Sequence, residues 1–376
     1  MAKSDGLRRG PFGSALKKEF FISSSEYTVY EQNNAIYNTW KTRYFITPEK
    51  FQELHKFQLM PGDFILSGAG TIGRIAQVPA NITKGVFNQA LIRIRINPEW
   101  MDKKFFLIWM QSENMQRKLT HANPGSAMTN LVPMSEIKKW EIIIPSKTEQ
   151  NKIGEFIQKL NSLIALHQRK LEHLQEQKKG LLQKMFPKNG ETIPEVRFPG
   201  FTDAWEQRKL GEVVNFLDTL RKPLEGAKRV KGPYPYYGAS GIVDYVDGYL
   251  FDEELILLSE DGANITERNY PVCFLASGKY WVNNHAHVLK IKEDNDNNFI
   301  CNSLERKDYT KYNTGMAMPK LNKETCKGIP IMCPNYDEQK KIGNYFRKFD
   351  TLIALHQRKL EHLELMKKGL LQQMFV

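Results

Sequence analysis

The hydrophobic residues of this chain follow a helical period in two long segments. In residues 149–186 and 338–375, apolar side chains recur in alternating steps of four and three residues, which is the spacing of a coiled-coil seam. At a rise of about 1.5 Å per residue, each segment predicts a helix roughly 50–55 Å long. The predicted seam consists of Ile157, Leu160, Ile164, His167, Leu171 and Leu174 in the first helix and of Phe346, Phe349, Ile353, His356, Leu360 and Leu363 in the second.

The two helical segments are copies of each other. They read "EQNKIGEFIQKLNSLIALHQRKLEHLQEQKKGLLQKMF" and "EQKKIGNYFRKFDTLIALHQRKLEHLELMKKGLLQQMF", with 26 of 38 positions identical. Because one helix cannot bury an apolar stripe alone, two matched stripes predict an intramolecular pair. The connection permits either orientation, but a duplicated unit closing on itself with pseudo-two-fold symmetry predicts an antiparallel coiled coil with a module at each end. His167 and His356 would then meet, and we expect them to fix register rather than to bind metal or catalyse.

Short apolar runs with Gly, Pro and Asn between them fill the rest of the chain and predict two α+β modules. Each module has a turn after an apolar run, "GDFILSGAGTIG" (Gly62–Gly73) and "EELILLSEDGANI" (Glu253–Ile265), and an Asn-containing strand follows each. A joint rich in Pro and Gly leads into the second module. The predicted boundaries are 1–148 for the first domain, 149–186 for the first helix, 187–337 for the joint and second domain, and 338–376 for the second helix.

Composition narrows the class of partner. The 376-residue chain has a net charge of +12, which favours nucleic acid over an acidic protein or a membrane surface. The four cysteines form no CxxC pair, so neither a zinc site nor a disulfide framework is expected. The N-terminal stretch lacks the apolar core of a signal peptide, and no run has the ~18 apolar residues of a membrane span. We therefore expect a cytoplasmic protein.

Motifs for catalysis or cofactor binding are weak. "GAGTIG" (Gly68–Gly73) fits GxGxxG, but a strand-like "RIAQVPA" follows where a dinucleotide fold needs a helix. There is no phosphate-binding GxxxxGK[ST] loop and no nucleophile elbow. "NHAH" supplies His285 and His287 on one face of a strand without a third ligand nearby, so a satisfied polar surface is favoured over a metal site. We expect no catalytic residue, no metal and no cofactor in this chain.

The order module–long helix–module–long helix resembles the DNA-specificity subunit of type I restriction-modification enzymes. The resemblance covers essentially the whole chain, and it is carried by the duplicated "LIALHQRKLEHL…KKGLLQ.MF", the preceding "P…EQ.KIG" and the joint "PEVRFPGFTDAWEQRKLGEV". It implies two target-recognition domains, each reading one half of a split, asymmetric double-stranded DNA target. Family members usually carry a segment like 194–213 before the first module as well, and this chain departs from that pattern.

The resemblance also implies the division of labour in a multisubunit system for phage defence. Two methyltransferase (modification) subunits would dock on the helices, and two motor-nuclease (restriction) subunits would complete the complex. S-adenosylmethionine, ATP and Mg²⁺ would act in those partners during DNA methylation and cleavage. This chain would be non-catalytic, in agreement with the absence of an Asn/Asp-Pro-Pro-aromatic motif.

Candidate DNA-contacting residues follow from the chemistry of readout. Lys and Arg suit phosphates and guanine, Asn and Gln suit adenine, and an acid accepts from the cytosine amine. For each residue the alternative is a role in loop structure, such as a positive φ at Gly70. The candidates are Lys41, Arg43, Gly70, Thr71, Arg74, Asn88, Gln89, Ser126, Thr129 and Asn130 in the first module and Glu260, Asp261, Asn264, Asn283, Asn284, His285 and Lys320 in the second.

Two other classes of function stay open at this point. The chain could be a structural coiled-coil adaptor whose modules bind protein, or a stand-alone DNA enzyme with a hidden active site. Salt-dependent, sequence-selective binding of duplex DNA together with a methyltransferase subunit would separate the main hypothesis from the adaptor. Methylation or cleavage by the isolated chain would support the enzyme.

Overall fold

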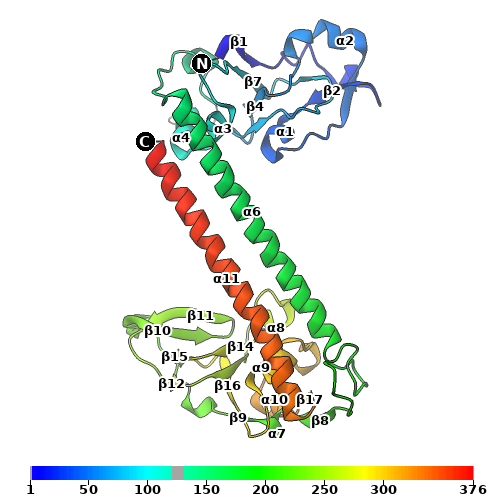
Figure 1. Ribbon diagram of the computed structural model, residues 1–376, viewed down its shortest axis with the longest axis vertical. Helices are drawn as coiled ribbons and strands as arrows, with labels where there is room; N and C mark the ends of the chain where they lie inside the picture. The colour runs from blue at the N-terminus through cyan, green and yellow to red at the C-terminus, as the bar shows by residue number, and fades with distance from the viewer. Residues whose placement is uncertain (1, 121–130, 376) are drawn as a thin grey trace. The chain divides into compact units, whose positions relative to one another are not determined.

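The computed structural model describes residues 2–120 and 131–375. The chain divides into two compact units, Met1–Leu166 with Lys359–Val376 and His167–Arg358. Two long helices, α6 (Lys147–Lys184) and α11 (Tyr336–Met374), each contribute one half to each unit (Figure 1). The predicted helices at 149–186 and 338–375 are therefore confirmed within two residues at their ends.

The first unit contains an antiparallel four-stranded sheet and a smaller three-stranded sheet. The larger sheet packs against α3 and α4 through an apolar core in which the rings of Phe64 and Phe106 lie 4.8 Å apart. The larger sheet has the strand order β1 (Ala2–Arg9), β7 (Leu91–Ile96), β4 (Phe64–Ser67) and β5 (Ile75–Gln77). The smaller sheet has the order β3 (Tyr44–Ile46), β2 (Tyr27–Tyr30) and β6 (Gly85–Phe87). The helices are α1 (Gln32–Tyr37), α2 (Pro48–Glu53), α3 (Lys103–Gln111), α4 (Glu113–Thr120) and α5 (Met134–Ile137).

The second unit contains two four-stranded sheets and one strand pair. The first sheet has the order β9 (Val214–Phe216), β16 (Ala286–Ile291), β13 (Leu255–Ser259) and β14 (Cys273–Ala276), and the second β11 (Gly241–Val246), β10 (Lys231–Gly238), β15 (Lys279–Val282) and β12 (Phe251–Asp252). The pair is β17 (Pro330–Cys333) with β8 (Glu206–Lys209). The helices of this unit are α7 (Leu210–Val213), α8 (Asn264–Glu267), α9 (Asn297–Glu305) and α10 (Lys323–Lys327). Short 3-10 turns occur at Lys18–Phe20 and His55–Phe57 in the first unit, and at Asp218–Leu220, Gly226–Lys228 and Thr310–Tyr312 in the second.

The two units share one topology although their modules share little sequence. Strands β1, β7, β4 and β5 correspond in order to β9, β16, β13 and β14, and the parallel pair β2 and β6 corresponds to β10 and β15. In both units a helix follows the strand, α3 after β7 and α9 after β16, and an aspartate side chain caps it. The duplication therefore extends from the long helices to the modules.

The duplicated "EQ.KIG" fastens each long helix to its module. In the first unit, Gln150 Oε1 accepts from the Asp102 N–H at 2.9 Å, and Gln150 Nε2 donates to the carbonyls of Trp100 and Pro145. In the second unit, Gln339 Oε1 accepts from the Asp296 N–H at 3.3 Å and its Nε2 donates to Pro334. Asp102 and Asp296 are the N-caps of α3 and α9. The duplicated glutamine, Gln150 in one unit and Gln339 in the other, thus ties the long helix to the start of the module helix.

The long helices pair in antiparallel fashion. In the second unit, the Nδ1 atoms of His167 and His356 lie 2.8 Å apart, and Lys178 Nζ lies 2.5 Å from Asp350 Oδ1. The residue number of the partner on α11 thus falls as the residue number on α6 rises, which is the pattern of antiparallel helices. In the first unit, Ile153 near the start of α6 and Phe375 at the end of α11 pack on the same core. The histidine contact that the seam predicts is present, while the pseudo-two-fold symmetry of the whole chain remains a prediction.

Candidate nucleic-acid interface

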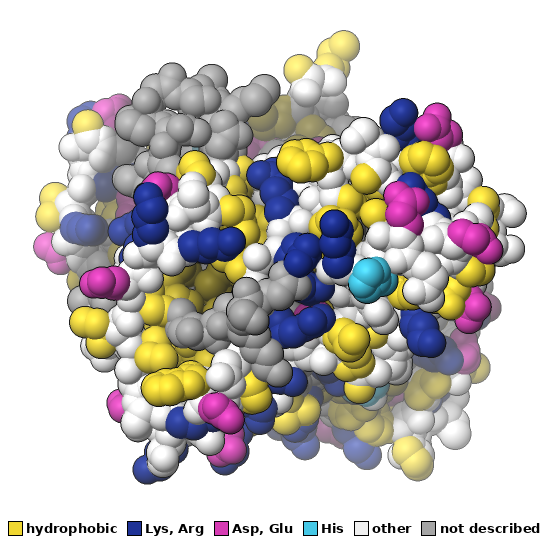
Figure 2. Space-filling view, turned by 90° about the horizontal axis from the view of Figure 1, so that it is seen from above, with side chains coloured by type: hydrophobic (Ala, Val, Ile, Leu, Met, Phe, Trp, Pro, Cys, Tyr) yellow, Lys and Arg dark blue, Asp and Glu magenta, His cyan; other side chains and the backbone are white. Residues whose placement is uncertain are grey.

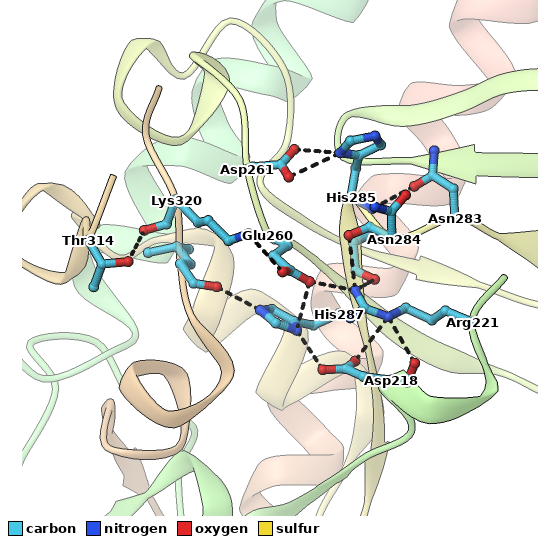
Figure 3. Close-up of polar contacts among 12 residues, drawn as sticks. Asp218, Arg221, Glu260, Asp261, Asn283, Asn284, His285, His287, Thr314 and Lys320 are labelled. Carbon is cyan, nitrogen blue, oxygen red and sulfur yellow. Dashed lines mark hydrogen bonds and ion pairs between the residues drawn. The ribbon is translucent and has the colours of Figure 1, made fainter. Parts of the chain in front are cut away.

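Three loops of the second module converge on one site. They are the loop after β13, the loop between β15 and β16, and residues 314–321, and Figure 3 shows their polar side chains close together. Backbone hydrogen bonds join them, from the Glu260 N–H to the His285 carbonyl at 2.9 Å and from the Leu321 N–H to the Glu260 carbonyl at 2.7 Å. A β-bridge joins Asp261 to Lys320. Residues that lie as far apart in the sequence as Glu260 and Leu321 are therefore held in one surface cluster.

A buried network of charges supports these loops from below (Figure 3). Arg221 Nη1 lies 2.7 Å from Glu260 Oε2, and Lys320 Nζ lies 3.4 Å from Glu260 Oε1. His287 Nδ1 lies 2.8 Å from Asp218 Oδ2, and its Nε2 lies 2.7 Å from the Leu321 carbonyl. Because oxygens that can only accept face both ring nitrogens, the imidazolium form of His287 satisfies both contacts.

The network also explains the ionisation of Asp218. Burial alone would raise its pKa, but the hydrogen bond and charge of His287, the charge of Arg221 and the Val288 N–H bring the pKa below its ordinary value. Asp218 is therefore an ionised carboxylate inside the module at neutral pH. Asp218 begins the 3-10 turn Asp218–Leu220, and its contacts with His287 and the Val288 N–H hold β16 to this turn.

The structure distributes the predicted residues of the second module between support and surface. Asn264 and Asn283 are buried, and the Asn264 amide donates to the carbonyls of Tyr270 and Pro271. Asn284 and His285 are exposed, and the Lys320 side chain is partly exposed. Asn264 and Glu260 thus have clear structural contacts, and the base-reading role expected of them stays a prediction.

His285 and His287 occupy different environments, unlike the expectation for "NHAH". His285 is exposed, whereas His287 is 1% exposed and sits within the charge network. The expected polar surface is correct for His285 and wrong for His287, because the loops 217–221 and 319–321 cover that face of β16. Among the described residues, no group of three or more His, Cys, Asp or Glu side chains is placed to hold a metal ion.

Where the structure describes them, the candidate DNA-contacting residues of the first module lie around a cavity, in the loop before β3 and in the hairpin between β4 and β5. Arg43, Asn88 and Gln89 line one cavity of about 280 Å³, where Arg43 also pairs with Glu31 at 2.9 Å. The Asn88 side chain accepts from the Ala90 N–H and so shapes its own turn. Lys41 is exposed in the loop before β3. Ser126, Thr129 and Asn130 lie outside the described residues.

The Gly-rich stretch Gly68–Gly73 is the turn of an antiparallel hairpin between β4 and β5. The Ser67 hydroxyl donates to the Thr71 carbonyl at 2.6 Å and accepts from the Arg74 N–H at 2.9 Å, which closes the turn. Gly70 has a φ of +62°, as its alternative role in loop structure predicts. Thr71 and Arg74 are exposed. A strand follows the turn, so the dinucleotide-binding interpretation is excluded.

Charge gathers on the first unit as well. Figure 2 shows Lys and Arg side chains near the middle of the face that it draws, with Asp and Glu side chains mostly toward the edges. Such a distribution favours binding of an anionic ligand to this face.

Among the residues described, no helix is both long enough and apolar enough to span a membrane.

The sequence analysis missed Asp218 and Arg221, and it placed His287 on the surface. Asp218 and Arg221 lie about 40 residues before Glu260 in a stretch without any motif, and no local pattern indicates the contact. His287 offered a signal, because an ionisable residue within the apolar strand Ala286–Ile291 requires a partner.

Comparison with known proteins assigns the family. The model of the type I restriction modification DNA specificity domain matches twice, at residues 12–176 and 202–365. The two matches cover most of the chain, each including one module and most of a long helix. The chain therefore belongs to the family of type I restriction-modification DNA specificity proteins, with two specificity domains.

Individual relatives agree with this assignment. A Haemophilus influenzae protein named as a type I restriction enzyme specificity subunit is 38% identical over 168 residues, 45% of this chain and 42% of the relative. The chain thus spans under half the length of that relative. A Methanocaldococcus jannaschii protein, named as the MjaX specificity subunit, is 22% identical over 347 residues, 87% of this chain and 80% of the relative.

A solved structure has the same fold. The S subunit of a type I restriction-modification system from M. genitalium matches with a TM-score of 0.60 and 17% identity, covering 98% of this chain and 93% of that one. The α+β architecture of two modules and two long helices is thus that of a solved S subunit.

Proposed function

We propose that this chain is the sequence-specific, double-stranded DNA-binding subunit of a type I restriction-modification complex. Each module reads one half of a split, asymmetric target, and the long helices set the spacing between the halves. The observation that carries the proposal is the duplicated unit: two modules of one topology, with unlike loop sequences, each fastened to its own long helix by the same glutamine. A shared scaffold with unlike loops suits two readers of different half-sites.

The loops on these scaffolds have the chemistry of DNA contact. Exposed Lys41 and Arg74 in the first module and Lys320 in the second are suited to phosphates, and such contacts provide salt-dependent affinity and register. Asn284, His285 and Gln89 are exposed side chains that carry donors and acceptors for base edges. The net charge of +12 agrees with a polyanionic ligand.

The long helices carry matched apolar positions that lie outside the seam. In the first unit, the side chains of Leu163 and Leu166 are each 46% exposed, and in the second unit their duplicates Leu352 and Leu355 are 43% and 40% exposed. In the first unit Leu163 and Leu166 also line an open groove of about 630 Å³. We assign these two faces to two methyltransferase subunits, since a duplicated face suits two copies of one partner.

The remaining chemistry belongs to partners in this proposal. S-adenosylmethionine serves the methyltransferase subunits, and ATP and Mg²⁺ serve two motor-nuclease subunits. The chain itself is non-catalytic and works in the cytoplasm, where its DNA target lies. Its contribution to the complex is the choice of sequence and the geometry of the two contacts.

Binding measurements test the proposal against a protein-binding adaptor. The full chain is combined with its methyltransferase subunit, and duplex binding is titrated between about 50 and 200 mM salt. We expect sequence-selective binding that weakens by at least an order of magnitude across this range, as for a protein with several phosphate contacts. Binding that is equal on all duplexes, or independent of salt, would contradict the proposal.

A further inference from the structure

We propose that His285 is a specificity-determining residue that reads an exocyclic base amine through its Nε2 atom. The inference rests on the proposed function and identifies the class of base edge that the second module selects at one position. Asp261 acts as a positioning residue, because its carboxylate orients the ring and selects its tautomer. Figure 3 shows the two side chains facing each other above the buried network.

The contact between His285 and Asp261 defines which ring nitrogen carries a proton. Nδ1 of His285 lies 2.8 Å and 3.0 Å from the two carboxylate oxygens of Asp261. An ionised carboxylate only accepts hydrogen bonds, so Nδ1 is the donor. In the neutral imidazole, Nε2 then keeps its lone pair and is an acceptor.

The backbone beneath the ring is fixed as well. The His285 N–H donates to Asn283 Oδ1 at 2.8 Å, and the His285 carbonyl accepts from the Glu260 N–H at 2.9 Å. The His285 side chain is nevertheless 51% exposed. A side chain that is held at its backbone and at one ring nitrogen, but open at the other, is pre-organised to present one atom to a ligand.

The neighbours of His285 differ from it in what they present. Glu260 directs its carboxylate to Arg221 and Lys320, and the Lys320 ammonium is a donor suited to phosphate. The Asn284 amide carries both a donor and an acceptor. In the neutral form of its ring, His285 therefore adds a single outward acceptor to this cluster.

The polarity selects a class of base. In the major groove, adenine N6 and cytosine N4 are amine donors, whereas guanine O6 and N7 and thymine O4 are acceptors. An acceptor at Nε2 pairs with an amine and is repelled by a carbonyl at the same place. The base found at this position of the recognised DNA sequence then shows whether the amine belongs to adenine or to cytosine.

Methylome sequencing of cells that express the full chain with its methyltransferase tests the inference. Wild type, Asp261→Asn, His285→Arg and a control, Glu253→Gln, are compared by the methylated fraction at target sites and at sites with single-base changes. Glu253 is an exposed carboxylate at the opposite end of β13, paired with Lys290. Melting curves of the purified variants establish that each is folded.

We expect adenine or cytosine at one position of the half read by the second module. Asp261→Asn frees the tautomer, so discrimination at that position should fall on the order of 10-fold, while His285→Arg should shift it toward guanine. The other half, and both halves for Glu253→Gln, should stay unchanged. Unaltered discrimination in both folded test variants would overturn the inference and leave the proposed function intact. Methylation without any sequence preference by the wild type would overturn the proposed function itself.

Discussion

The buried ion pair between Arg197 and Glu338 should dominate the stability of the joint against the second long helix. Arg197 Nε and Nη2 each lie 2.7 Å from one oxygen of the Glu338 carboxylate. The Glu338 side chain is fully buried and that of Arg197 is 11% exposed. Removing the arginine by Arg197→Met would leave a buried carboxylate without its partner, which costs about 3–5 kcal/mol.

Two further variants make this prediction sharp. The double variant Arg197→Met with Glu338→Leu removes both charges and should recover most of the loss, because apolar replacement of a whole buried pair is often close to neutral. Glu149 is the counterpart of Glu338 in the first copy and is exposed, so Glu149→Gln should change stability by less than about 0.5 kcal/mol.

Urea unfolding, with hydrogen exchange of the α9 amides as the local readout, measures these differences. The ion pair does not have the predicted effect if Arg197→Met costs no more stability than Glu149→Gln, or if the double variant is as unstable as the single one. The first result would mean that the pair is not desolvated. The second would mean that contacts of Arg197 outside the ion pair, such as its hydrogen bond to the Asp203 carbonyl at 2.7 Å, stabilise the joint.

Three other features give testable expectations. A Cβ at Gly343 would lie 2.0 Å from the Asp296 carboxylate that caps α9, whereas a Cβ at Gly180 would meet open space. In urea unfolding, Gly343→Ala should therefore cost about 1–3 kcal/mol of stability, and Gly180→Ala should add up to ~1 kcal/mol. Equal effects of the two substitutions would contradict the close contact at Gly343. The pKa of Asp218 is lowered in the fold. Its contribution to the free energy of unfolding is therefore present above the unfolded pKa near 3.9 and is lost as pH falls through the folded pKa. Asp218→Asn should make stability depend less steeply on pH between about pH 5 and 2, and an unchanged pH dependence would contradict this. Replacing His167 and His356 together by Leu should raise the melting temperature while loosening helix register, and a lower melting temperature would show that the pair stabilises the seam.

The sequence was most informative where a pattern repeats. The four-and-three spacing predicted both long helices, because helix periodicity depends only on local geometry. The duplication, with the two-fold closure that it suggests, predicted the meeting of His167 with His356. The duplication also indicated that the modules are related, although it could not show that β1, β7, β4, β5 and their counterparts share one strand order. Strand pairing joins segments far apart in the chain, and alternation of side chains does not identify the partner.

The candidate site was predictable in its loops but not in its support. Glu260, Asp261, His285 and Lys320 were identified from turns and polar clusters, and the structure brings them together. The buried Asp218 escaped notice because nothing in its local sequence marks a residue that becomes a partner only after folding. For the same reason the sequence could not show that Asn264 faces inward to its own loop.

In the proposed function, two unlike modules read two separate halves of one DNA target. It is tested most directly by exchanging residues 1–148 for the first module of another specificity subunit and sequencing the methylome of cells that carry the hybrid with its methyltransferase. We expect one half of the recognised sequence to change while the other half and the spacing between them persist. A change in both halves, or in neither, would contradict it.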